Sequence, residues 1–263
     1  MFALQDTRGA VEIAFTDRHG GVSDGPYASL NLAHSDGDDP DTVEENLDIA
    51  AYAFARGWEA SGSNPFVFPS GTPWPRMVAT MSQVHGSHVA VLHPVDVESQ
   101  REQQPPVADA LVTKVPGVIL MVRAADCLPV LLADVERAVI GAAHAGRRGL
   151  VSGIVPSTVE TMRGLGAREI LAWLGPHVCG RCYEVPTEMR TQVSSVVPES
   201  YALTSWGTPA LDIGKGVRAQ LDFERVSIAG VSRRCTKEDE DLYSYRRQGG
   251  ESGRLAGMVW IRP

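Results

Sequence analysis

Two apolar runs joined by a short polar turn dominate the hydrophobic pattern of the chain. Residues 129–134 read PVLLAD and residues 138–143 read AVIGAA, with VER at 135–137 between them. Apolar runs of this length bounded by turn residues are typical of buried β-strands, and so short a connection predicts a hairpin. Cys127 and His144 lie at the outer ends of the two runs, so we expect them to meet at the open end of the hairpin.

The remaining pattern predicts strands and helices interspersed along the whole chain. Helical spacing predicts one helix that begins after an Asp39 cap and ends at Gly57, and a second over 150–163 with Pro156 in its first turns or at a kink. Two more helices are predicted at 187–196 and 211–223, and polar, Pro-containing loops at 59–75 and 98–106. Short apolar or alternating segments predict strands at 11–15, 77–81, 89–92, 110–113, 118–122, 170–174, 226–231 and 258–261.

This order of elements favours an α/β (α+β) fold with mixed β-sheets. Regular strand–helix–strand crossovers, which a doubly wound parallel sheet requires, are not evident. The pattern also contains no linker between independent halves and no convincing internal repeat. We therefore predict a single domain over residues 1–263.

Composition narrows the class of protein and its partners. Of the 263 residues, 43% are hydrophobic and 21% charged, which is ordinary for a soluble globular protein. The formal net charge of −8 argues against a nucleic-acid partner, because such proteins usually carry a basic face. Neither a secretion signal nor a membrane span is evident, and four cysteines do not suggest a disulfide scaffold. We expect a cytoplasmic protein.

Cysteine and histidine offer the candidate chemistry. A thiolate and an imidazole brought together form a metal site or a cysteine nucleophile with its base, although these two residues alone favour a buried cysteine beside a hydrogen-bonded histidine. Cys179 and Cys182 have zinc-knuckle or redox spacing. A structural tetrahedral zinc needs a second pair, however, and Cys127 and Cys235 are isolated from one another, so we predict no function for the CxxC motif.

Short phrases spread over nearly the whole chain resemble those of a known family. They include TDRHGGVSDGPYASLNL, QVHG, ADALVT, ADCLPVLL, HAGRRG, CYEV and SYRR, and they occur in the family's order. The chain is similar to the laccase-domain family, whose members were named multicopper polyphenol oxidases. They are now described as zinc-dependent purine nucleoside phosphorylases with adenosine deaminase activity. QVHG with ADC and HAG is a specific combination, whereas each phrase alone would be weak.

The resemblance implies a single α/β domain with packed mixed sheets and outer helices, and metal ligands at His85, Cys127 and His144. Two imidazoles and one thiolate form a sensible open zinc site, because the fourth position stays available for water or substrate. One departure concerns Arg147, which stands where the family usually has tryptophan, while Arg148 matches a family arginine. The departure leaves the substrate preference open.

The implied activities require further groups around the metal. Zinc can act as a Lewis acid or lower the pKa of bound water, which would serve deamination at the purine 6-position together with an acid/base carboxylate. Asp126 is a candidate for that carboxylate. It could equally be a turn residue whose side chain forms hydrogen bonds with main-chain groups. Phosphorolysis requires an anion site, for which forked guanidinium donors are suited. The candidates for binding phosphate are Arg18, Arg148 and Arg246, and the candidates for binding the base or the ribose are Ser29, Asn31 and Gln83. Roles in turns, in helix caps or on the surface would also explain each of these residues.

Three other functions compete with this one. A copper phenol oxidase would use Cu²⁺ and needs paired His-x-His motifs, which the seven histidines do not form. A metal-free cysteine hydrolase would use Cys127 as nucleophile and His144 or His85 as base. A partner-binding or cell-wall-editing factor would hold zinc in a closed, structural site. The sequence does not predict the oligomeric state or rank the purine nucleosides.

Overall fold

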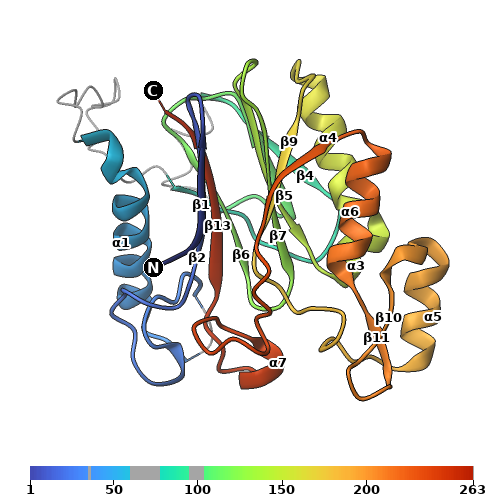
Figure 1. The fold of residues 1–263 in the computed structure, drawn as a ribbon. Coiled ribbons are helices and arrows are strands. Elements are labelled where there is room, and N and C mark those ends of the chain that lie inside the picture. The colour runs from blue at the N-terminus through green and yellow to red at the C-terminus, as the bar shows by residue number, and fades with distance from the viewer. Residues whose placement is uncertain (35–36, 60–77, 95–103, 263) are drawn as a thin grey trace.

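Two β-sheets pack face to face between helical layers, as Figure 1 shows. The structure, a computed structural model, describes residues 1–34, 37–59, 78–94 and 104–262. The five-stranded sheet has the order β1 (Phe2–Arg8), β2 (Val11–Thr16), β13 (Leu255–Ile261), β6 (Ile119–Ala124), β3 (Val78–Ala79). The six-stranded sheet has the order β12 (Ser227–Val231), β9 (Leu171–Leu174), β7 (Leu128–Asp134), β8 (Val139–Ala145), β5 (Ala110–Thr113), β4 (Val89–Leu92). Both sheets contain parallel and antiparallel pairs, so the predicted mixed-sheet α/β class is confirmed.

The alternation of side chains along each strand produces the layers. In β6, Ile119 and Met121 join the core under the helix α1 (Pro40–Glu59), whereas Leu120 and Val122 join the core between the two sheets. Successive side chains of a strand point to opposite faces, so a strand that is apolar at every position is buried on both sides. The same holds for β7, all of whose residues are buried.

Helices cover the outer face of each sheet. On one side α1 begins after Asp39, whose Oδ1 accepts hydrogen bonds from the amides of Asp41 and Thr42 at 2.9 and 3.0 Å. It continues past Gly57 to Glu59, so the predicted end was two residues early. The other side carries α3 (Arg147–Ser152), α4 (Ile154–Gly164), α5 (Thr187–Val196) and α6 (Ile213–Phe223). Shorter elements are α7 (Tyr245–Gln248), the 3-10 turns η1 (Gly25–Tyr27) and η2 (Pro198–Ser200), and the small hairpin β10 (Tyr201–Leu203) with β11 (Pro209–Leu211).

The expectation of one helix over 150–163 was wrong. Gly153 adopts a left-handed φ of 80° that separates α3 from α4. Pro156 is then the third residue of α4, within its first turn as predicted. The strand β1 and the β10–β11 hairpin were not predicted. Residues 60–75 and 98–103 of the two predicted loops, like Met77 of a predicted strand, lie outside the described residues.

The predicted hairpin is confirmed and sets the position of the site. Strands β7 and β8 pair antiparallel with Pro129 opposite His144, and the turn follows Asp134. Cys127 directly precedes β7, so it lies beside His144 at the open end. Among the helices that the structure describes, none is long and apolar enough to cross a bilayer.

Candidate metal centre

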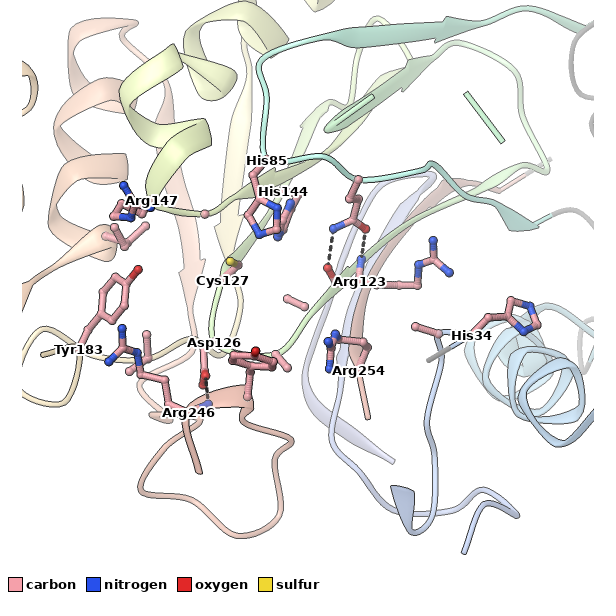
Figure 2. Close-up of a pocket in the computed structure, with 18 residues that line it drawn as sticks. His34, His85, Arg123, Asp126, Cys127, His144, Arg147, Tyr183, Arg246 and Arg254 are labelled. Atoms are coloured by element: carbon pink, nitrogen blue, oxygen red, sulfur yellow. Dashed lines mark hydrogen bonds between the residues drawn. The ribbon is translucent and has the colours of Figure 1, made fainter. Parts of the chain in front are cut away.

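Three side chains from two separate segments converge at the open end of the hairpin. Cys127 directly precedes β7, His144 lies in β8, and His85 comes from the turn between β3 and β4. One donor atom of each residue lies within 4.8 Å of the others. Figure 2 shows the Cys127 sulfur directed toward both imidazoles, whose ring centroids are 4.8 Å apart.

Asp109 orients the His144 ring and anchors the main chain that carries His85. Its buried carboxylate accepts a hydrogen bond from His144 Nδ1 at 2.9 Å, and His144 thereby keeps Nε2 for another partner. The same carboxylate accepts the main-chain amides of Val84, His85 and Gly86 at 3.2, 2.9 and 2.6 Å. This network holds the QVHG turn against the hairpin, in the arrangement typical of metal-bound histidines, whose second nitrogen bonds a carboxylate.

Close packing around the ligands depends on two unusual backbone positions. His85 has a φ of 62°, a left-handed conformation that non-glycine residues seldom adopt without a structural reason. Gly146 follows β8, and a Cβ atom there would lie 2.8 Å from Cys127 Sγ and 2.9 Å from His85 Cδ2. Only glycine allows the backbone to approach both ligands so closely.

The charges of the three ligands and Asp109 are coupled. Burial alone would raise the pKa of Cys127, but His144 and His85 lower it to about 6. Burial would lower the pKa of His144, but the Cys127 thiolate and Asp109 raise it to about 9. Hydrogen bonds from His144 and the main chain hold the Asp109 pKa low against the opposing effect of burial. The lowered pKa of Cys127 and the raised pKa of His144 both favour a thiolate beside an imidazolium.

These residues fit a metal ion with an open coordination position. Two imidazoles and a thiolate are ligands that zinc prefers, and no fourth His, Cys, Asp or Glu donor joins the three among the described residues. The three line a cavity of about 550 Å³, which is within the usual range for small-molecule sites.

Two arginines line the same cavity without a carboxylate partner. Arg123 Nη2 donates to the Met81 carbonyl at 2.9 Å, and Arg254 Nη1 donates to the Ser252 and Gly253 carbonyls. Among the described residues no carboxylate forms an ion pair with either guanidinium. Burial lowers the pKa of both arginines, and the charge of Arg254 adds to the effect on Arg123. The charges of Cys127 and Asp126 oppose the effect of burial on the Arg254 pKa, without forming an ion pair with it. Two adjacent, partly buried guanidiniums that form no ion pair in the described part of the chain are suited to an anion.

Aromatic and basic side chains form the opposite wall of the cavity. Tyr183, Arg147 and Arg246 line it, and Tyr245, which lies close enough to Arg254 to act on its pKa, also lines the cavity. The Arg246 guanidinium stacks 4.3 Å from the centroid of the Tyr183 ring and donates to the Glu184 carbonyl at 2.7 Å. Figure 2 places Tyr183 and Arg246 on one side of Cys127 and Arg123 and Arg254 on the other. The cavity thus has two ends, one on either side of the candidate metal ligands. At the aromatic end Tyr183 stacks with Arg246, and Arg147 adds a second positive charge, whereas Arg123 and Arg254 form the cationic end.

Other predicted binding residues lie outside the cavity lining. Arg18 donates from Nε to the Ala28 carbonyl at 2.6 Å and stacks on Tyr243, and Arg148 is exposed on α3. Ser29 Oγ accepts the amides of Gly20 and Gly21 at 3.0 and 3.2 Å. Buried Asn31 bonds Ala33, Asp38 and the Arg254 amide. Of the predicted phosphate, base and ribose residues, Gln83 and Arg246 do line it.

Asp126 lines the cavity with both carboxylate oxygens already bonded. Oδ1 accepts hydrogen bonds from Thr236 at 2.6 Å and Ser244 at 2.7 Å, and Oδ2 accepts the Arg246 amide at 2.7 Å. Its main-chain φ of 85° turns the backbone just before Cys127. These contacts favour the structural one of the two roles expected for Asp126, because they join the ADC segment to the C-terminal region.

Comparison with known proteins shows the family of the chain. Residues 12–262 match the family model described as multi-copper polyphenol oxidoreductase laccase. The chain belongs to this laccase family. A purine nucleoside phosphorylase of Streptomyces coelicolor is 47% identical over 264 residues, covering 99% of this chain and 100% of that protein. The purine nucleoside phosphorylase YfiH of Escherichia coli is 37% identical, covering 93% and 91%. The crystal structure of YlmD from Geobacillus stearothermophilus superimposes with a TM-score of 0.80 at 29% identity, covering 100% and 99%.

Three residues of this laccase-family site were not expected from the sequence. Asp109 stands directly before a wholly buried strand, and an acidic residue in that position is itself a signal of a buried polar network. Arg123 and Arg254 interrupt or precede apolar strands, which is a similar signal. Single charged residues within or beside apolar runs were therefore better indicators of the residues at this site than the glycine-rich N-terminal loop.

The structure places a second ligand pair beside the CxxC motif, which the sequence did not indicate. Cys127 and Cys235 were expected to be isolated from one another, and Cys235 lies instead with Cys179 and Cys182, with Glu238 beside them. Their ligand atoms all lie within 4.8 Å of one another. The second pair of ligands consists of Cys235 and Glu238, in a Cys-x-x-Glu turn that follows the CxxC motif by more than fifty residues.

Proposed function

We propose that the protein is a zinc-dependent purine nucleoside phosphorylase that also deaminates adenosine. The observation that carries the proposal is the three-ligand cluster of His85, Cys127 and His144 at the floor of a cavity with a cationic and an aromatic end. The relatives named purine nucleoside phosphorylase support the same chemistry. A cytoplasmic location, with a purine nucleoside and inorganic phosphate as small-molecule partners, is part of this proposal.

His85, Cys127 and His144 would hold the zinc ion, and Asp109 would keep His144 oriented with Nε2 toward it. When bound, zinc supplies Lewis acidity and lowers the pKa of a coordinated water. The protein contributes the rigid frame, since Asp109 connects the histidines of two segments and Gly146 lets them approach Cys127. The affinity for zinc should therefore depend on Asp109 as well as on the three ligands.

Arg123 and Arg254 would bind the phosphate. Both residues line the cavity, are partly buried and form no ion pair with a described carboxylate. Arg18 and Arg148 do not line the cavity, so the placement favours Arg123 and Arg254 over them. Gln83 positions Arg123, because its side-chain amide exchanges two hydrogen bonds with the Arg123 main chain at 2.8 and 2.9 Å. A preorganised cationic pair would also stabilise the anionic nucleophile as it approaches the ribose.

Tyr183 and Tyr245 would bind the purine base. Aromatic rings stack on bases of any sequence, and Tyr245 lines the cavity although its ring is half exposed. Arg147 lies at the same end, where a cationic side chain can also stack on a base or bond its acceptor atoms. This arrangement would place the glycosidic bond between the aromatic and cationic ends, beside the candidate zinc ligands.

Phosphorolysis is better supported here than deamination. Of the described lining residues, Asp126 is the only carboxylate, and both of its oxygens already accept hydrogen bonds. A deaminase needs a carboxylate that exchanges protons with the substrate. The anion site needs no such group, so we expect phosphate-dependent cleavage to be the faster of the two reactions.

The test is chromatography of adenosine incubated with the zinc-loaded protein, with and without phosphate. The proposal predicts adenine and ribose 1-phosphate only when phosphate is present, and slower formation of inosine in both samples. Cys127→Ala provides the control for contaminating enzymes. Unchanged adenosine at high protein concentration, with zinc confirmed at the His85–Cys127–His144 site, would refute the proposal.

A metal-free cysteine hydrolase is the second candidate. The observation in its favour is the thiolate–imidazolium pair, since the pKa of Cys127 is lowered to about 6 beside His144. Such an enzyme would be active after chelation of zinc, inhibited by added zinc and inactivated by alkylation of Cys127. A phosphorylase that requires zinc shows the opposite response to chelation.

A further inference from the structure

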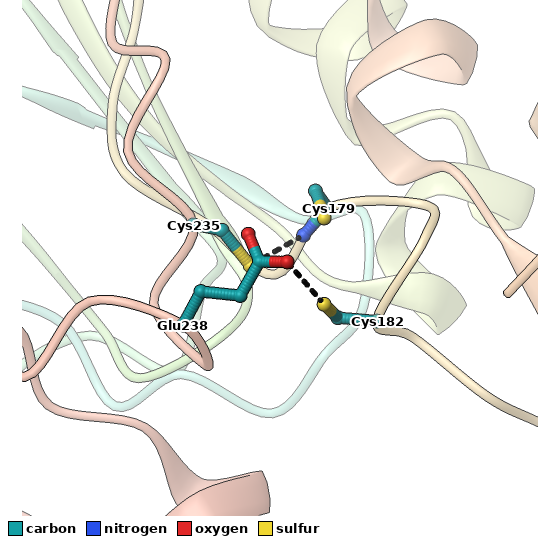
Figure 3. A group of neighbouring side chains, drawn as sticks. All are labelled: Cys179, Cys182, Cys235 and Glu238. Carbon is teal, nitrogen blue, oxygen red and sulfur yellow. Dashed lines mark hydrogen bonds between the residues drawn. The ribbon is translucent and has the colours of Figure 1, made fainter. Parts of the chain in front are cut away.

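Four ligand-type side chains form a second cluster, shown in Figure 3. Cys179 and Cys182 lie in the loop after β9, and Cys235 and Glu238 lie in the loop after β12. Strands β9 and β12 are parallel neighbours, so the chain leaves both at the same edge of the sheet. The pairing continues beyond them through a bridge between His177 and Cys235.

The two loops form turns of the same geometry. In the first, the Cys179 carbonyl accepts the amides of Cys182 and Tyr183 at 2.9 and 3.0 Å. In the second, the Cys235 carbonyl accepts the amides of the third and fourth following residues at 3.2 and 2.9 Å. Each turn therefore directs the side chains of positions i and i+3 to one side, as the paired-cysteine turns of structural zinc sites do.

The distances within the cluster suit tetrahedral coordination. Zinc–sulfur bonds of about 2.3 Å separate two sulfur ligands by about 3.8 Å. The donor atoms of the cluster lie within 4.8 Å of one another, so binding requires only small side-chain rotations. The Cys182 sulfur is already 3.2 Å from Glu238 Oε1, and the Cys179 amide donates to the Cys235 sulfur at 3.3 Å. Hydrogen bonds from main-chain amides to a ligand sulfur are the outer-sphere contacts expected of a site in which cysteine thiolates bind a metal.

Ordinary burial of cysteine does not explain this group. Cys182 and Cys235 are buried and could pack as small apolar residues. The carboxylate of Glu238, however, accepts a hydrogen bond from Cys182 Sγ at 3.2 Å, although its side chain is half exposed. Its nearest cation, Arg181, is 4.0 Å away and mostly exposed, so that ion pair contributes little to its position.

We propose that Cys179, Cys182, Cys235 and Glu238 bind a second zinc ion, in a closed structural site. Thiolates with one carboxylate are suited to zinc, and four protein ligands leave no position for substrate. This proposal does not depend on the proposed function, because it concerns separate residues. The two sites also differ in coordination, since the three-ligand centre faces the cavity and leaves a coordination position open, whereas the four-ligand site would be closed.

The second site would position the cavity wall. Val178 and Tyr183 flank the CxxC turn and line the cavity. Thr236 follows Cys235 and donates its hydroxyl to Asp126 at 2.6 Å. A zinc ion that joins the two turns would therefore hold the aromatic side of the cavity and the ADC segment in a fixed relation.

Zinc content of the full-length protein tests the proposal. After loading with Zn²⁺ under reducing conditions and buffer exchange, native mass spectrometry should show about two zinc ions per chain. Cys127→Ala should lose one, Cys235→Ser should lose the other, and the double variant should lose both. A wild-type protein with a single zinc ion that Cys127→Ala removes, and that Cys235→Ser retains, would overturn the proposal.

A milder variant and a spectroscopic measurement cover the case in which Cys235→Ser does not fold. Glu238→Gln should release zinc to a chelator faster than wild type, whereas Glu240→Gln, an exposed glutamate two residues away, should not. Cys127→Ala protein loaded with Co²⁺ should retain strong sulfur-to-cobalt absorption from the three remaining thiolates. Loss of that absorption in the folded Cys127→Ala variant would equally overturn the proposal.

Discussion

The carboxylate of Asp109 accepts a hydrogen bond of 2.9 Å from Nδ1 of His144. The bond spans two strands that pair antiparallel, β5 and β8, and both side chains are buried. Because Asp109 also accepts the His85 amide, one carboxylate positions two of the three candidate metal ligands. The geometry of the centre therefore depends on a residue that does not itself contact the metal.

Replacement of that carboxylate should weaken zinc binding without removing a ligand. Asp109→Asn keeps the size of the side chain but loses the charge that orients His144. Outer-sphere substitutions of this kind typically cost about 10- to 100-fold in metal affinity. Chelator competition measures the effect. Asp134→Asn, a buried aspartate whose bonds go to main-chain amides at the other end of β7, serves as the control and should bind zinc like wild type.

Gly146 should tolerate no side chain. A methyl group there would lie 2.8 Å from Cys127 Sγ, so Gly146→Ala should displace the ligands and reduce both zinc content and activity. Gly164→Ala is the matched control, because nothing lies within 4 Å of a Cβ at that position. It should leave zinc content unchanged and add up to about 1 kcal/mol of helix stability. Equal zinc content in the two variants, by mass spectrometry, would contradict the role of Gly146.

Local pattern was sufficient to predict the elements that carry the site. The β7–β8 hairpin consists of continuous apolar runs around a polar turn, and α1 has an aspartate cap, so neighbouring residues determine both. β1 was missed because residues 2–8 form a half-exposed edge strand in which apolar residues do not alternate cleanly. The break at Gly153 was missed because the apolar spacing continues through it.

Convergence between distant segments could not be predicted from local pattern. His85 was placed with Cys127 and His144 only through the family resemblance, since more than forty residues separate it from Cys127. The approach of Cys235 to the CxxC motif depends on the parallel pairing of β9 with β12, which no spacing in the sequence indicates. Arg123 and Arg254 meet for the same reason, through the pairing of β6 with β13.

The cationic end of the cavity should determine the affinity for phosphate. Arg123→Met or Arg254→Met removes a charged donor and should raise the KM for phosphate at least about tenfold. The KM for adenosine should change little. Arg148→Met gives the comparison, because that exposed arginine matches a family arginine but lies outside the cavity lining. A larger effect of Arg148→Met in steady-state kinetics would instead support the assignment made from the sequence.

The aromatic end should determine the affinity for the nucleoside. Stacking on an aromatic ring contributes about 1–3 kcal/mol per base, so Tyr245→Leu should raise the KM for adenosine about tenfold. The KM for phosphate should remain near the wild-type value. Tyr201→Leu, at a similarly exposed tyrosine outside the cavity, controls for general effects of the substitution. Parallel changes in both KM values for Tyr245→Leu would argue against a separate base site.

The central claim is that phosphorolysis depends on zinc held by His85, Cys127 and His144. Phosphorus NMR of adenosine and inorganic phosphate, with protein stripped of metal and then reloaded with Zn²⁺, tests it most directly. The account predicts a ribose 1-phosphate signal that disappears on stripping, returns with zinc and stays absent in Cys127→Ala. A signal that persists in the stripped protein, or in Cys127→Ala, would contradict it.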